Sequence, residues 1–98
     1  MRIDVTQEDI ESGEPGEPGY CPIALAFKRV CPLDDIRDIE VMEMECQVRV
    51  HARPDGWWVY SLPDQAQDFV SLFDDEWKVE PFAFEMSDQP EWIPHNRR

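Results

Sequence analysis

The chain has 98 residues, of which 42% are hydrophobic and 11% aromatic, enough for one modest core and too few for two. Its 22 acidic residues outnumber its 9 lysines and arginines, so the formal net charge is -13. Because phosphates repel such a chain, the charge excludes direct nucleic-acid binding and anionic membranes and favours basic proteins as partners.

Two further features concern the compartment. The sequence contains no apolar stretch long enough for a membrane span, and its first residues are acidic where a secretory signal would be apolar. The three cysteines, Cys21, Cys31 and Cys46, are an odd number without metal-ligand spacing, which favours reduced thiols over a disulfide framework. We therefore expect a soluble protein of the cytoplasm.

The N-terminal segment predicts a short strand followed by a short helix. Residues 2–5 have strand character, and Thr6 is a candidate N-cap for a helix over 7–12, with Asp9 placed to complete a capping box. Gly13 supplies the stop. Residues 14–19 then repeat Glu-Pro-Gly twice, and we call them the EPG loop; proline and glycine exclude regular structure there and predict a mobile acidic loop.

The middle of the chain predicts a buried helix and a hairpin. Residues 22–30 begin with Pro22, a favoured first helical residue, and contain an apolar run that predicts the centre of the core. From residue 42 to 52 the side chains alternate, which places Met44, Cys46 and Val48 on a core face and Glu43 and Glu45 on the other. A turn over 53–56 leads to a return strand over 57–62.

The C-terminal third predicts a helix, an edge strand and a tail. A helix starting at Pro63 carries four apolar residues on one face and Asp64 and Asp68 on the opposite face. Residues 78–86 predict a last strand, placed at a sheet edge because Pro81 cannot donate a ladder hydrogen bond. Residues 87–98 are expected to form a loosely held tail with Trp92 as its anchor.

Together these elements predict a single α+β domain over residues 1–86, a small antiparallel sheet of three to four strands with two or three short helices packed on one face. Nearly all apolar positions are assigned to these elements. The acids therefore gather in three segments, 7–19, 34–45 and 64–76. Whether the three share one face stays open at this point.

A spaced pattern along residues 3–86 resembles a family of small uncharacterised bacteriophage and prophage proteins. Its parts are Val5-Thr6-Gln7-Glu8 with Ile10, Cys21-Pro22-Ile23-Ala24-Leu25-Ala26, Leu62-Pro63, Phe69, Phe73-Asp74 and Val79-Glu80-Pro81-Phe82-Ala83-Phe84. The resemblance implies a phage origin, and therefore the cytoplasm of a host cell. It implies no activity, so no catalytic residue is carried over. The EPG loop and the twin tryptophans depart from the pattern.

The residues give little support to catalysis or metal binding. Cys21 at a helix N-terminus with His51 as a base has no third orienting group, and a buried structural cysteine is the more economical interpretation. Cys21, Cys31, Cys46 and His51 lack the close pairs of zinc sites. The acidic runs 34–38 and 74–76 lack the spacing of a calcium loop and indicate solvated loops. We expect no enzyme, no cofactor and no metal.

The remaining hypothesis is a binding surface. Like charges that share a strand face or a helix face cost stability, so their retention suggests use, although an acidic coat that serves only solubility is an open alternative. We expect a phage protein that inhibits a basic host nucleic-acid-handling protein or nucleoprotein complex, of the anti-CRISPR or anti-restriction type, by a DNA-like face. The expected contact residues are Glu43, Glu45, Asp64, Asp68, Asp74, Asp75 and Glu76, with Trp57 or Trp58 as an aromatic anchor.

The second hypothesis is a structural, assembly or homo-oligomeric phage protein without catalysis. It would pair through an exposed sheet edge or through the tryptophan surface. Association that survives high salt would favour this hypothesis, whereas salt-sensitive capture of a basic protein would favour the inhibitor.

Overall fold

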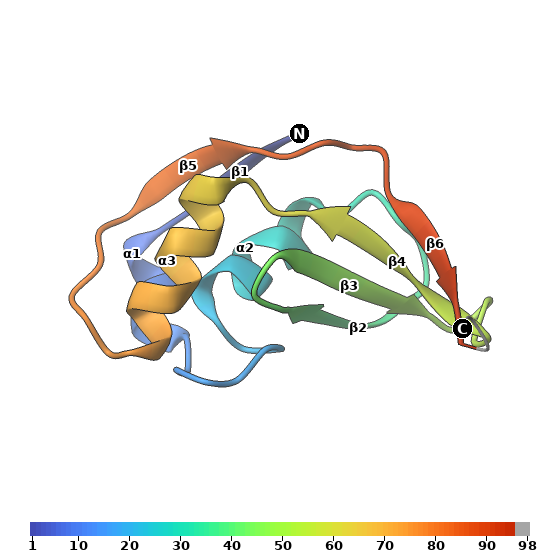
Figure 1. Ribbon diagram of the computed structural model, residues 1–98, viewed down its shortest axis with the longest axis horizontal. Coiled ribbons are helices and arrows are strands. Elements are labelled where there is room, and N and C mark those ends of the chain that lie inside the picture. Colours follow the sequence, from blue (N-terminus) through green and yellow to red (C-terminus); the bar gives the residue numbers. More distant parts are fainter. Residues whose placement is uncertain (96–98) are drawn as a thin grey trace.

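The computed structural model describes residues 1–95 and contains three helices and two antiparallel sheets (Figure 1). This confirms the predicted α+β class. In chain order the elements are β1 (Arg2–Val5), α1 (Gln7–Ser12), α2 (Pro22–Val30), β2 (Ile36–Val41), β3 (Glu45–Val50), β4 (Gly56–Ser61), α3 (Asp64–Asp74), β5 (Phe82–Glu85) and β6 (Glu91–Pro94).

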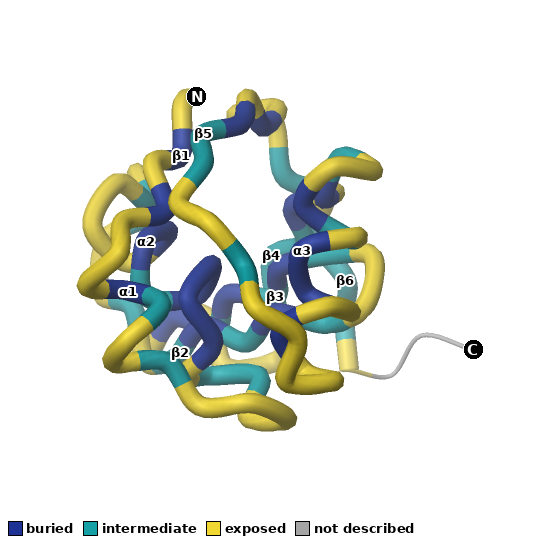
Figure 2. Tube along the Cα trace, turned by 90° about the vertical axis from the view of Figure 1, so that its left-hand side faces the viewer, coloured by how far each residue is buried: buried dark blue, intermediate teal, exposed yellow. Residues whose placement is uncertain are grey.

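The larger sheet has the strand order β2-β3-β4-β6, and all its neighbours are antiparallel. Its buried side chains lie on one face, where they join residues of α2 and α3 in a single hydrophobic core. Phe27 of α2 meets Tyr60 of β4 edge to face, with ring centroids 5.0 Å apart. The tube in Figure 2 shows the buried residues concentrated between the helices and this sheet. The prediction that the helices pack on one face is therefore confirmed.

Strand β2 corrects the prediction of a solvated acidic loop after residue 34. The alternation of buried and exposed residues along β2 is not evident in the sequence, because the pairing register of β2 with β3 shifts between Ile36 and Asp38. Beyond this irregularity Ile39 and Val41 face the core. Asp38 and Glu40 point to the outer face, where both form ion pairs with Arg49 of β3. Acidic residues are tolerated in this strand because a cross-strand arginine lies opposite them.

Strand β6 differs from the expectation of a loosely held tail. It pairs with β4 over four residues, so part of the predicted tail completes the sheet. Trp92 acts as the predicted anchor, since its ring packs edge to face on Trp58 at 5.2 Å and the Arg53 guanidinium lies 3.7 Å above it. Residues 96–98, the last part of that predicted tail, lie outside the described residues.

The smaller sheet consists of β1 and β5, and it pairs the N-terminal strand with a strand from the last third of the chain (Figure 1). The predicted strand over 78–86 is confirmed only for Phe82–Glu85, and residues 77–81 run back beside α3 as irregular chain. The interruption follows from Pro81, which has no backbone N–H to donate.

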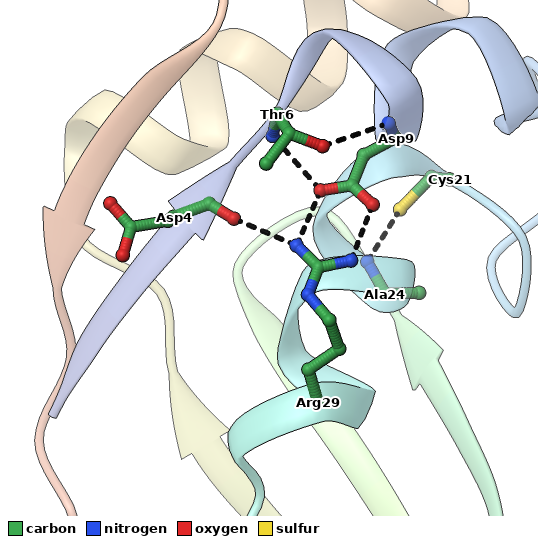
Figure 3. A network of polar contacts seen from close by, with 6 residues as sticks. All are labelled: Asp4, Thr6, Asp9, Cys21, Ala24 and Arg29. Carbon is green, nitrogen blue, oxygen red and sulfur yellow. Dashed lines mark hydrogen bonds and ion pairs between the residues drawn. The ribbon is translucent and has the colours of Figure 1, made fainter.

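A polar network ties the first helix to the second (Figure 3). Thr6 and Asp9 form the predicted capping box, in which each side chain accepts a hydrogen bond from the other's backbone N–H. Arg29 of α2 donates two hydrogen bonds, of 2.6 and 2.7 Å, to the buried Asp9 carboxylate and one to the carbonyl of Asp4. The Arg29 guanidinium holds the pKa of Asp9 below its usual value.

Candidate protein-binding surface

Three long-range hydrogen bonds bring the acidic segments of the chain together. The backbone N–H of Gly16 in the EPG loop donates to Asp74 Oδ1 at the end of α3. The N–H of Val41 donates to the carbonyl of Pro18, which joins the loop to the end of β2. The N–H of Leu62 donates to the carbonyl of Met44, which joins the β2–β3 turn to the start of α3. The loop, the turn and α3 therefore lie next to one another (Figure 1).

These bonds show which of the acidic segments adjoin one another. Of the three acidic segments, the EPG loop, residues 43–45 and residues 64–76 adjoin one another. The acids of β2 are directed elsewhere, since Asp38 and Glu40 face Arg49 on the outer side of the sheet. The EPG loop, expected to be mobile, is hydrogen-bonded to α3 and to β2.

We call the resulting region the acidic surface. It contains six of the seven acids expected from the sequence and two from the EPG loop. The seventh, Glu45, alternates with the buried Cys46 and therefore points to the outer face of the sheet, as Arg49 does. Glu45 is half-buried and accepts a hydrogen bond from Gln47 on that outer face, whereas all members of the acidic surface are exposed. Within residues 1–95, none of them forms an ion pair. The eight members are Glu14, Glu17, Glu43, Asp64, Asp68, Asp74, Asp75 and Glu76.

Helix α3 carries the central part of the acidic surface. Asp64, Asp68 and Asp75 are separated by four and seven residues, a spacing that aligns them along one helical face. At a rise of about 1.5 Å per residue, this row extends over roughly 16 Å. The opposite face buries Ala66, Phe69, Val70 and Phe73, as the sequence predicted.

The C-terminal end of α3 is electrostatically unfavourable. Asp74, Asp75 and Glu76 gather where the helix dipole is negative, and the last turn contains no basic residue. Glu76 also has a φ of 62°, a left-handed conformation that glycine or asparagine usually supplies at this position. Its N–H donates to the carbonyl of Phe73, and that of Trp77 donates to Leu72, which closes the helix. The chain thus keeps three acids at the negative end of a helix dipole, where Asp74 gains the hydrogen bond from the Gly16 N–H.

The twin tryptophans, expected to supply an aromatic anchor, pack against arginine and aromatic side chains of this chain. Trp57 lies on the outer face of the sheet, beneath the Arg49 guanidinium and against the ring of His95. Trp58 lies on the inner face against Trp92 and Arg53. Their alternation across β4 was predicted correctly, but both rings are occupied by neighbours of this chain, several of them basic.

The exposed apolar side chains near the acids were not predicted. Met44 was assigned to a core face, yet β3 begins only at Glu45, so Met44 lies in the turn and is 64% exposed. Leu72 on α3 and Trp77 just beyond it are 45% and 66% exposed. Leu72 gave one signal in the sequence, because it lies outside the 66, 69, 70, 73 face of the helix. The acidic surface therefore contains apolar contact area as well as charge.

The chemistry of the thiols points away from catalysis at Cys21. The Sγ of this residue accepts the N-cap hydrogen bond from the N–H of Ala24 at 3.5 Å, and burial raises the pKa of the thiol (Figure 3). Burial also raises the pKa values of Cys31 and Cys46. Such thiols are protonated at neutral pH and are poor nucleophiles.

Within residues 1–95, no group of three or more histidines, cysteines and carboxylates is arranged to hold a metal ion. None of the helices in this part of the chain is long and apolar enough to span a membrane. Comparison with protein-family models, with curated proteins and with solved structures finds no match to the chain. The acidic surface is therefore the feature from which we infer a function.

Proposed function

We propose that the protein binds a basic partner protein through the acidic surface. The observation that carries this proposal is the convergence of three segments, distant in sequence, on one region of carboxylates without counter-ions in the described chain. Like charges at this density oppose folding, and a coat kept for solubility alone has no need to concentrate them. A basic partner would supply the missing counter-charges.

For the partner class, we propose a nucleic-acid-handling protein whose nucleic-acid site the acidic surface occupies. B-DNA has about one charge per 1.7 Å, so roughly ten phosphates lie along the ~16 Å that the α3 row covers. The row itself supplies three carboxylates over this length, and the other five of the acidic surface lie in the EPG loop, the β2–β3 turn and the end of α3. With the resemblance to phage proteins, this supports an inhibitor of a host CRISPR complex or restriction enzyme.

The assembly hypothesis finds less support at the edge of the larger sheet. Strand β2 is an edge strand, and its Val41 N–H points outward to the Pro18 carbonyl of the EPG loop. The Gly19 Cα also lies against the outward carbonyl of Ile39, where an added Cβ would approach to 3.5 Å. The loop thus covers part of the edge that a second chain would need.

A capture and displacement experiment tests the proposal. Tagged protein is mixed with the fraction of a bacterial lysate that heparin retains, which is enriched in basic nucleic-acid-binding proteins. A captured protein is then loaded with a labelled DNA duplex, and release of the duplex is measured by fluorescence anisotropy. We expect the protein to release the duplex, with less release at high salt.

Two double variants separate the acidic surface from net charge. Asp68→Lys with Asp75→Lys reverses two acids of the α3 row, and Asp34→Lys with Asp88→Lys makes the same charge change elsewhere on exposed positions. The first should abolish displacement and the second should preserve most of it. If both double variants lost DNA displacement equally, net charge alone would explain the effect and the role of the acidic surface would be rejected. If a captured protein kept its DNA in the presence of the wild type, the proposed partner class would be overturned.

A further inference from the structure

An apolar groove lies beside the acidic surface, between α3 and the chain that follows it. After the left-handed residue Glu76, the chain turns and runs back along the helix to β5 (Figure 1). The groove between them has a volume of about 330 Å³. Gln65, Asp68, Phe69 and Leu72 line it from the helix, at a spacing that forms one ridge.

The floor of the groove is aromatic and its opposite wall is irregular chain. The rings of Phe69 and Phe82 stack at 4.7 Å and close the bottom. Val79 packs partly against the core and, with Lys78 and Glu80, forms the second wall. Leu72 stands at the rim, almost half exposed, which is unusual for leucine beside a formed apolar floor.

The charges around the groove are mostly acidic. Asp68 and Glu80 line it on opposite walls, and Asp75 and Glu76 lie at the end of the helix that forms the first wall. Lys78 is the one basic residue among the lining residues. A second copy of this chain would bring its own net charge of -13 to an acidic rim, so a basic occupant is favoured.

We propose that this groove receives a bulky apolar side chain of the partner, from a segment in which lysine or arginine flanks that side chain. The inference rests on the proposed binding of a basic protein and adds the apolar anchor to it. A volume of about 330 Å³ is small for a ligand pocket, which fits one or two side chains. The basic neighbours pair with Asp68 and Glu80, while Leu72 covers the inserted group. Such apolar contacts, surrounded by charge pairs, carry most of the affinity in protein interfaces.

Two synthetic peptides provide the test. The first is an amphipathic helix of lysine and leucine of about 15 residues, and the second replaces every leucine by serine at the same charge. Binding is measured by titration calorimetry, and the contact region is located by amide chemical shifts. We expect the lysine-leucine peptide to bind at least tenfold more tightly and to shift the amides of residues 65–82.

Two matched variants make the test specific. Leu72 and Val30 are exposed to 45% and 44%, on helices with different surroundings. Leu72→Ser should remove the tenfold preference for the apolar peptide, and Val30→Ser should preserve it. A preference that survives Leu72→Ser, or shifts confined to other residues, would overturn the groove assignment.

The outcomes also distinguish the groove from the proposed function. If both peptides bind equally and binding falls with salt, the groove assignment fails while recognition of basic proteins stands. If neither peptide binds, both fail. A dimer of the protein alone, detected by sedimentation and abolished by Leu72→Ser, would identify a second copy as the occupant and overturn the inference.

Discussion

The position of Glu76 allows a direct measurement of what the acidic surface costs the fold. This residue combines a left-handed backbone with a negative charge at the negative end of α3. A left-handed backbone costs a residue other than glycine about 1–2 kcal/mol of stability. Substitution by glycine removes this cost, but glycine's greater flexibility in the unfolded chain offsets about 0.5–1 kcal/mol of the gain. The charge term at an exposed helix end is about 0.3–1 kcal/mol.

Two substitutions separate these terms. Glu76→Gln removes the charge and keeps the backbone strain, so it should raise the free energy of unfolding by about 0.3–0.5 kcal/mol at low salt. Glu76→Gly removes both and should raise it by about 1 kcal/mol, which corresponds to roughly 4–8 °C in Tm for a domain of this size. The assay is urea unfolding followed by tryptophan fluorescence, at about 0.05 M and about 0.5 M salt.

Salt should weaken the charge contribution to stability and leave the backbone contribution unchanged. High salt should erase the difference between the wild type and Glu76→Gln and leave the difference between the glutamine and glycine variants. Glu80→Gln, which neutralises an exposed acid away from a helix end, is the control and should change stability by no more than a few tenths of a kcal/mol. If Glu76→Gly is no more stable than Glu76→Gln, the claim of strain at this position is refuted.

Three more predictions concern the stability of the domain that carries the acidic surface. Arg29 lowers the pKa of Asp9, so the stability from this carboxylate is full above its unfolded pKa of about 4 and is lost as the pH falls through the lower folded value. Asp9→Asn should therefore destabilise the protein by about 1–3 kcal/mol at pH 7, and urea unfolding should show the difference narrowing below about pH 4. Gly56→Ala places a Cβ against the backbone of β6 and should destabilise by about 1–3 kcal/mol with loss of amide protection in β6, whereas Gly19→Ala, in ordinary contact, should show neither effect. Trp57→Phe removes a buried indole N–H that has no partner among the described residues, so thermal unfolding should show little or no loss of stability.

The elements that sequence alone predicted are those specified by local signals. The capping box of Thr6 and Asp9, the Pro22 start of α2 and the alternation of Cys46, Val48 and Val50 each depend on neighbours within a few residues. All residues that form such a signal lie close together in the sequence, so the element can be predicted without knowledge of the fold.

The strands that were missed depend on distant residues. Strand β2 carries acids and an irregular register that only Arg49 of β3 explains, and β6 follows a proline and is held by Trp58 of β4. The same limit applied to the site. The acids of α3 were identified from helical spacing, but the hydrogen bond from Gly16 to Asp74 joins residues 58 positions apart. No local pattern predicts that contact, so the adjacency of the EPG loop and α3 could not be derived from the sequence.

The salt dependence of the complex tests the central claim most directly. The dissociation constant for the captured partner is measured from about 0.05 M to about 0.5 M salt with the wild type and both double variants. We predict that the affinity of the wild type falls steeply with salt, and that Asp68→Lys with Asp75→Lys lowers it about 100-fold at low salt. Asp34→Lys with Asp88→Lys should lower it no more than about threefold. An affinity independent of salt, or equal losses in the two variants, would contradict recognition through the acidic surface.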